Sequence, residues 1–163
     1  MRSTRRSRQS QTSLADLFEQ IAEGASAESN VWASALLPSG ERELVAVFSP
    51  LAPAELALGL ETVYEAYLTH YGTPRLFHAG DPDEAILLGD YLYAHGLVRI
   101  AEAGGVAAVS VLAGLISRCA ALRADGQAGD GEAWVAAARA LGGRPTDDDV
   151  DRALARHSVR VAA

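Results

Sequence analysis

One run of carboxylates in this chain has the spacing of a magnesium-binding motif. The run Asp147–Asp151 reads Asp-Asp-Asp-Val-Asp and matches the pattern Asp-Asp-x-x-Asp. Clustered carboxylate oxygens are ligands that Mg2+ prefers. The run directly follows Pro145 and Thr146, where a helix is expected to begin. Acidic residues in a first helical turn complement the helix dipole, and Thr146 can cap the exposed amides. We therefore interpret the run as helix capping and keep a metal site as the alternative.

Other reactive groups are sparse. All 14 basic residues are arginine, so chemistry that needs lysine is excluded. Cys119 is the single cysteine, which rules out an internal disulfide and a cysteine-based zinc site. The four histidines have no metal-ligand spacing with one another. Gly104 and Gly105 are not followed by the lysine or hydroxyl residues of a phosphate-binding loop. We predict no metal site in this chain.

Length and composition indicate one globular domain. The 163 residues are 49% hydrophobic and 21% charged, with a net charge of -7 that argues against a nucleic-acid surface. Residues 1–12 carry four arginines without an apolar run behind them, and we predict a disordered basic tail there. Residues 13–163 are expected to form a single all-helical domain. We expect no membrane span, since the longest apolar run is too short, and we expect a cytoplasmic protein.

The pattern of apolar residues predicts helices throughout. Ser13 is a plausible N-cap for a helix that ends at Gly24, and a second helix begins near Ser26 and stops before Pro38. Residues 42–48 alternate like a strand, but we predict a helix because no other strand is available as a partner. Pro53 can open a long helix over residues 54–71. Further helices are expected over residues 84–125, around 134–141, and after Thr146.

The stretch 84–125 organises the chain. It is predicted as two helical runs that meet in a tight turn at Gly104 and Gly105. The first run has an expected buried face with three- and four-residue spacing, formed by Ile86, Asp90, Tyr93, Ala94, Leu97 and Ala101. The second run is nearly apolar all round, so other helices or another chain must cover it. Its expected subunit interface consists of Val106, Val109, Leu112, Ala113, Ile116 and Ala120.

Residues 72–105 resemble the central segment of the all-trans isoprenyl (polyprenyl) diphosphate synthases. Gly72 and Pro74 fit the family's G-x-P loop, and the GDYL string that contains Gly89, Asp90 and Tyr91 fits its following helix, with the usual spacing. The resemblance implies an antiparallel helical bundle, here an isoprenoid-synthase-like half bundle. It also implies prenyl transfer between two diphosphates, with Mg2+ held by two aspartate-rich motifs.

The chain departs from the family where that chemistry is carried out. Aligned from Gly72, the first aspartate-rich motif falls on Glu61, Thr62 and Glu65, which leaves two carboxylates four residues apart. Such a pair could bind a metal weakly, but it is also commonplace on a solvated helix face. His70 and Tyr71 replace two arginines, and the family's diphosphate-binding lysines are missing. Asp147–Asp151 lies too near the C-terminus for the second motif.

These observations predict a catalytically degenerate small subunit of a heteromeric polyprenyl diphosphate synthase. It would stabilise a catalytic large subunit and help to set the prenyl chain length. We expect no activity of the chain alone, no catalytic residue and no cofactor bound by this chain, with Mg2+ in the partner. Two alternatives stay open. The chain could be a stand-alone homodimeric protein that binds an isoprenoid or another lipid, or a weakly active Mg-dependent enzyme.

Overall fold

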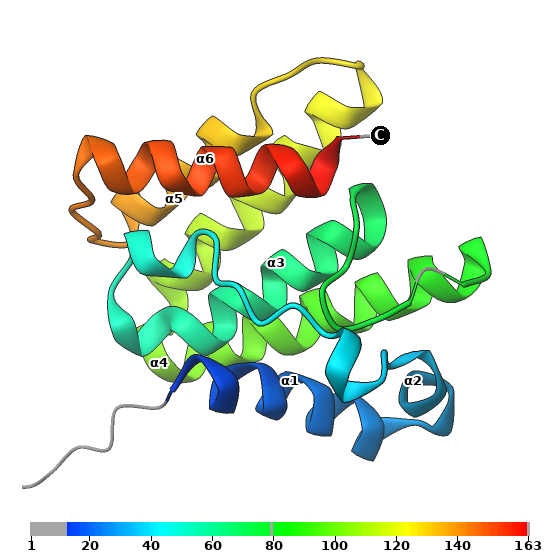
Figure 1. Ribbon diagram of the computed structural model, residues 1–163. Helices are drawn as coiled ribbons and strands as arrows, with labels where there is room; N and C mark the ends of the chain where they lie inside the picture. The colour runs from blue at the N-terminus through cyan, green and yellow to red at the C-terminus, as the bar shows by residue number, and fades with distance from the viewer. Residues whose placement is uncertain (1–12, 79, 163) are drawn as a thin grey trace, which may run out of the picture.

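A computed structural model of the chain describes residues 13–78 and 80–162, and these residues form an all-α structure (Figure 1). No strand occurs among them; Leu36 and Phe77 form one isolated antiparallel bridge. The α-helices are α1 (Leu14–Glu28), α2 (Asn30–Ala35), α3 (Ala57–Tyr71), α4 (Pro82–Ala124), α5 (Asp130–Ala140) and α6 (Asp147–Val161), with three short 3-10 turns at Ser39–Glu41, Ser49–Leu51 and Ala54–Leu56. The predicted tail, residues 1–12, lies outside the described part.

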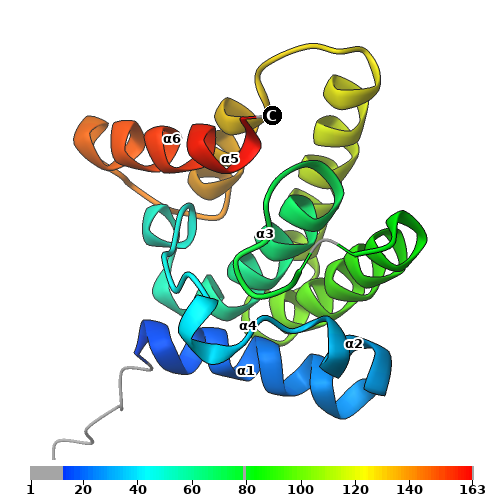
Figure 2. The same ribbon diagram turned by 45° about the vertical axis from the view of Figure 1, so that its right-hand side comes forward.

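Helix α3 is the central element. It packs against α1 and along both limbs of α4 (Figures 1 and 2). Its residues from Gly59 to Leu68 are all buried. A helix buried on this scale has apolar residues on every side. Any polar side chain on α3 must therefore find its partner inside the protein.

Helix α4 turns back on itself at Gly105, as predicted. Gly105 has φ 69° and ψ -169°, a conformation open to glycine, while the residues on either side are helical. Both views show the second limb returning from the first in a V (Figures 1 and 2). The prediction of two helical runs that meet at this point is confirmed.

The buried face of α4 differs from the predicted one. Ile86 is 52% exposed, and Asp90, Ala94 and Ala101 are also exposed. The buried residues are instead Leu88, Gly89, Leu92, Gly96 and Ile100 on the first limb and Ala108, Leu112, Leu115, Cys119 and Leu122 on the second. Glycine explains the difference. A Cβ at Gly96 would lie 2.5 Å from Cγ2 of Val63, so only glycine lets α3 approach this closely.

Two predicted helix boundaries and one predicted helix near the N-terminus are wrong. Helix α1 continues through Gly24 to Glu28. Helix α2 therefore starts late, capped by Ser29. Residues 42–48 form no helix.

Residues 42–46 are irregular and residues 47–48 form a bend, because groups from other elements bind their peptide groups. Arg75 donates to the carbonyl of Val45 over 2.8 Å, and Arg156 donates to that of Ala46 over 3.0 Å. The amide of Glu43 donates to the carbonyl of Arg75 over 3.1 Å. These bonds satisfy backbone groups that a helix would otherwise pair internally.

Candidate functional site

Helix α3 carries the two glutamates that align with the family's first aspartate-rich motif. Glu61 and Glu65 are four residues apart, so they lie on the same face of the helix. The structure contradicts the expectation that this face is solvated, because the two side chains are 1% and 0% exposed. Buried carboxylates need charged or hydrogen-bonding partners.

Arg75 is the partner of both carboxylates. Its Nε donates to Glu65 over 2.9 Å, and its Nη1 donates to Glu61 over 2.6 Å. The guanidinium lies 4.8 Å from the ring centre of Phe18 and 5.0 Å from that of Tyr64. Burial opposes the charged form of Arg75, but the two carboxylates outweigh it and raise its pKa. We call Glu61, Arg75 and Glu65 the clasp.

The loop after α3 brings Arg75 to this position. Gly72 ends α3 with its amide bonded to the carbonyl of Leu68, and the chain then folds back along the helix. The amides of Arg75 and Leu76 both donate to Oε1 of Glu65 over 2.8 Å. Glu65 therefore accepts three hydrogen bonds from one loop, while Oε1 of Glu61 has no partner.

The clasp does not suit Mg2+. The ion needs near-octahedral oxygen ligands at 2.0–2.1 Å and usually keeps several waters, whereas a guanidinium and two aromatic rings fill the space beside these carboxylates. In the described part of the chain no three His, Cys, Asp or Glu residues are grouped to hold a metal ion. Glu61 and Glu65 are structural ion-pair partners in this conformation.

The Asp147–Asp151 run caps α6. Oγ1 of Thr146 accepts from the amide of Asp149 over 3.2 Å, and the Asp149 carboxylate accepts from the amide of Thr146 over 3.0 Å. The hydroxyl of Thr146 also donates to the Asp149 carboxylate over 2.8 Å, and this bond, together with the one from the Thr146 amide, lowers the pKa of Asp149. This reciprocal pair is a capping box, and the capping interpretation is confirmed.

The remaining family-pattern residues are spread over several contacts of α3, α4 and the loop between them. The ring of His70 lies against Gly89, where a Cβ would be 2.4 Å from its Nε2. Asp90 is exposed and lies 3.4 Å from the same nitrogen, so its predicted place on the buried face is wrong. Tyr91 donates to the carbonyl of Gly24 over 3.1 Å. Gly72 and Pro74 border a surface groove of about 490 Å³.

A second buried polar network was missed by sequence reasoning. Asp130 accepts from both Arg123, over 2.6 and 2.9 Å, and the hydroxyl of Tyr67. Nδ1 of His157 lies 2.9 Å from the hydroxyl of Tyr64, and its Nε2 lies 3.6 Å from Asp130. Burial opposes ionisation of Asp130, but the hydrogen bonds from Tyr67 and Arg123 lower its pKa. No motif marks these residues, which come from four different helices.

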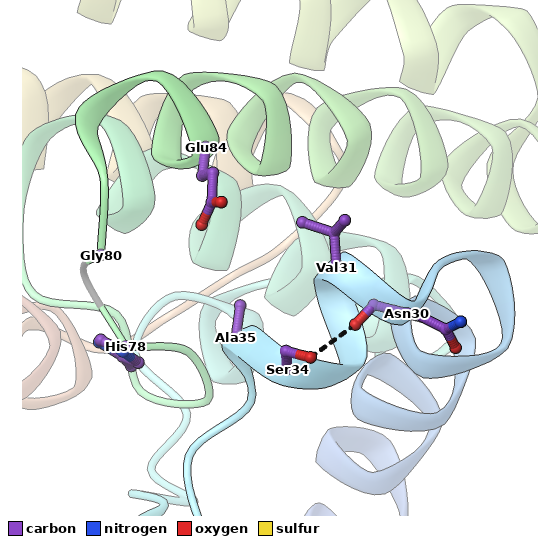
Figure 3. Close-up of a pocket in the computed structure, with 7 residues that line it drawn as sticks. All are labelled: Asn30, Val31, Ser34, Ala35, His78, Gly80 and Glu84. Carbon is purple, nitrogen blue, oxygen red and sulfur yellow. Dashed lines mark hydrogen bonds between the residues drawn. The ribbon is translucent and has the colours of Figure 1, made fainter.

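The grooves on the described surface lie away from the clasp. Figure 3 shows one of about 360 Å³, lined by residues of α2, by His78 and Gly80, and by Glu84 at the start of α4. Within this lining, Oγ of Ser34 donates to the carbonyl of Asn30 over 2.8 Å. None of the clasp residues lines this groove. We assign it no chemistry.

The predicted interface on the second limb of α4 divides between core and surface. Leu112 is fully buried, Val109, Ile116 and Ala120 are partly buried, and Val106 is 85% exposed. Ala113 is also exposed. No charged residue occurs between Glu102 and Arg118. An exposed helical surface without charge is typical of a contact with another apolar surface.

Helix α4 is long and apolar enough to cross a membrane. Core helices of soluble proteins also reach this length and hydropathy, so the two properties alone do not assign a membrane span. The reversal at Gly105 divides α4 into two limbs.

Comparison of the chain with protein-family models, with curated proteins and with solved structures finds no match.

Proposed function

We propose that this chain is a noncatalytic small subunit of a heteromeric all-trans polyprenyl diphosphate synthase, with an isoprenoid-synthase-like half-bundle fold. In this role it stabilises a catalytic large subunit and helps to set the length of the prenyl product. The proposal starts from the resemblance of residues 72–105 to that family. Mg2+ and the residues that ionise the diphosphate belong to the partner.

The clasp is the observation that carries the proposal. Where the resemblance places metal-binding carboxylates, this chain has Glu61 and Glu65 closed by Arg75, with all three side chains at most 1% exposed. The guanidinium of Arg75 neutralises both carboxylates and leaves no open coordination position for a metal ion. This arrangement favours a structural role over the weakly active enzyme.

The second limb of α4 supports the need for a partner. Between Glu102 and Arg118 its exposed face carries no charged residue, although the chain has 21 acidic residues elsewhere. Water solvates such an uncharged, largely apolar face poorly. Small exposed residues along it allow another helix to approach closely: Ala107, Ser110, Ala113, Gly114, Ser117 and Ala121. The same face also suits a second copy of the chain, which is the stand-alone alternative.

The test is co-expression with a candidate large subunit that retains its aspartate-rich motifs. We expect co-purification at a 1:1 ratio, and prenyl transfer from an allylic diphosphate and isopentenyl diphosphate only by the complex or the large subunit. Turnover by the chain alone would overturn the proposal. A homodimer that does not bind the large subunit would support the stand-alone alternative instead.

A matched pair of variants locates the contact. Val106→Glu places a charge on the exposed face of α4, whereas Val159→Glu places one on the exposed face of α6, where Val159 is 75% exposed. We expect Val106→Glu to abolish co-purification and Val159→Glu to leave it intact. Equal loss in both variants, or loss in neither, would contradict the assigned face.

A further inference from the structure

Helix α6 is attached to the body of the protein by few buried side chains. Only Ala153 and His157 of its 15 residues are buried. Figure 1 shows α6 on the outside of the molecule, alongside α5. His157 is the larger of these two buried side chains, and the partly buried Val150, Leu154 and Val161 also pack against the core. The state of His157 therefore bears directly on whether α6 stays docked.

Groups from four elements surround His157. Tyr64 and Tyr67 face it from α3, Arg123 from α4, and Asp130 and Glu132 from α5. The 3-10 turn at Ser49–Leu51 is preceded by Phe48, whose ring centre lies 5.3 Å from that of His157 and which carries no ionisable group. Three of these neighbours are charged: Arg123 is cationic, and Asp130 and Glu132 are anionic.

This geometry fits neutral His157. The Tyr64 hydroxyl is 2.9 Å from Nδ1 and can donate to it in the tautomer whose ring proton is on Nε2, which faces Asp130 at 3.6 Å. The oxygens of Asp130 are already bound by Arg123 and Tyr67. A second ring proton would have to go on Nδ1, and the Tyr64 hydroxyl would then have to turn its own proton into an aromatic environment. Phe48 and Trp134 form that environment.

The charged form of His157 is therefore disfavoured in the docked state. Burial lowers its pKa, and the negative charge of Asp130 offsets this only in part. A histidine freed from this site has an ordinary pKa of about 6.5. Docking is thus complete above about pH 6.5 and weakens as the pH falls from there toward the lower pKa of the docked state.

Helix α6 also binds segment 42–48. Arg156 donates to the carbonyl of Ala46 over 3.0 Å, and Arg160 pairs with Glu43. The carbonyl of Arg160 accepts from the amide of Thr73 over 2.9 Å. Segment 42–48 in turn covers the clasp, because Arg75 donates to the carbonyl of Val45. Detachment of α6 removes the three contacts made by Arg156 and Arg160 together, while the bond from Arg75 remains.

We propose that α6 is an acid-released strap, in which protonation of His157 detaches α6 and uncovers the aromatic cluster of Phe48, Tyr64 and Trp134. This device goes beyond the proposed function and does not depend on a partner chain. It gives the protein two states, one in which the cluster is closed and one, favoured by acid, in which an apolar surface is open.

Hydrogen exchange of the purified chain, corrected for the intrinsic effect of pH, tests the proposal. We expect the opening of α6 amides to increase up to about 30-fold between pH 7.5 and 5.0, the limit set by a free histidine of pKa 6.5. Amides of α1 should keep their protection. A change below twofold in α6, or an equal change in α1 and α6, would overturn the proposal.

Tryptophan fluorescence supplies a second readout. The chain has two tryptophans, and Trp32→Phe leaves Trp134, which is 2% exposed and packs on Phe48. In this background we expect a red shift and stronger acrylamide quenching at pH 5.0 than at pH 7.5. An emission maximum and quenching constant that do not change would overturn the proposal.

Variants of His157 separate proton binding from packing. His157→Gln keeps an acceptor for Tyr64 but does not titrate, and His157→Phe keeps the ring volume. We expect each to lose the acid-induced opening, and His95→Gln, a partly exposed histidine on α4, to retain it. Persistence of the full pH effect in His157→Gln would refute the role of His157. If both variants fail to fold, the comparison of α6 and α1 in the unmodified chain decides.

Discussion

Replacement of Arg75 by methionine is the perturbation that probes the clasp most sharply. Methionine fills much of the volume of the side chain but removes its charge and its four side-chain hydrogen bonds, to the carboxylates of Glu65 and Glu61 and to the carbonyls of Val45 and Glu61. Two buried carboxylates then lose their counter-ion. Removal of one partner from a buried ion pair costs about 3–5 kcal/mol.

That loss is a large share of the stability of a typical domain, which is about 5–15 kcal/mol. For a chain of this size each kcal/mol lowers the melting midpoint by about 2–4 °C, so Arg75→Met should lower it by about 6–20 °C. Urea unfolding followed by circular dichroism measures the same change as a free energy.

Neutral partners should rescue the variant. In Glu61→Gln/Glu65→Gln/Arg75→Met no unpaired charge remains, and we expect it to recover more than half of the lost free energy, because a buried ion pair adds little over neutral packing. Arg152→Ala, which removes an exposed i,i+3 pair with Asp149, serves as the control and should leave the midpoint unchanged. If Arg75→Met behaves like Arg152→Ala, Arg75 does not hold the two carboxylates together and the reasoning is refuted.

Three further predictions concern packing, capping and pH. Gly96→Ala should lower the free energy of unfolding by about 1–3 kcal/mol, because its Cβ would meet Val63 at 2.5 Å. Gly114→Ala, with open space around it, should stabilise the helix by up to about 1 kcal/mol. Thermal melts of both variants measure these changes, and equal effects would contradict the close α3–α4 approach. Thr146→Ala should cost about 1 kcal/mol by removing the cap of α6, and an unchanged unfolding midpoint would count against the capping box. Burial lowers the pKa of both His70 and His157, so their contribution to stability is complete above about pH 6.5 and is lost as the pH falls below it; a free energy of unfolding that rises from pH 7 to pH 5.5 would contradict this sign.

The sequence predicted those parts of the fold that local patterns determine. Ser13 and Thr146 cap helices as expected, because side-chain capping needs only residues three positions away. Gly105 reverses the chain, because two adjacent glycines interrupt an otherwise helical run. The all-helical class followed from the same periodicity.

Features that depend on tertiary contacts could not be predicted. Residues 42–48 have an ambiguous pattern, and bonds from Arg75 and Arg156 decide their conformation. The buried face of α4 was missed because Gly89 and Gly96 count as neither apolar nor large, although their small size is what brings α3 close. Hydrophobic periodicity identifies buried positions with large apolar side chains, but it does not identify glycines at close helix–helix contacts.

The clasp shows the same limit for the candidate site. The spacing of Glu61 and Glu65 was visible, but Arg75 lies ten residues beyond Glu65 in a loop, and no spacing rule links them. The network around Asp130 and His157 joins residues separated by up to 93 positions in the chain. Such pairings become visible only in three dimensions.

Direct measurement of Mn2+ binding, with Mn2+ in place of Mg2+, tests the central claim that Arg75 closes the two carboxylates to metal. Electron paramagnetic resonance of Mn2+ titrated with the purified chain reports free and bound ion separately. We predict no saturable site that depends on Glu61 and Glu65. Stoichiometric binding by the unmodified chain that disappears in Glu61→Gln/Glu65→Gln would contradict the account.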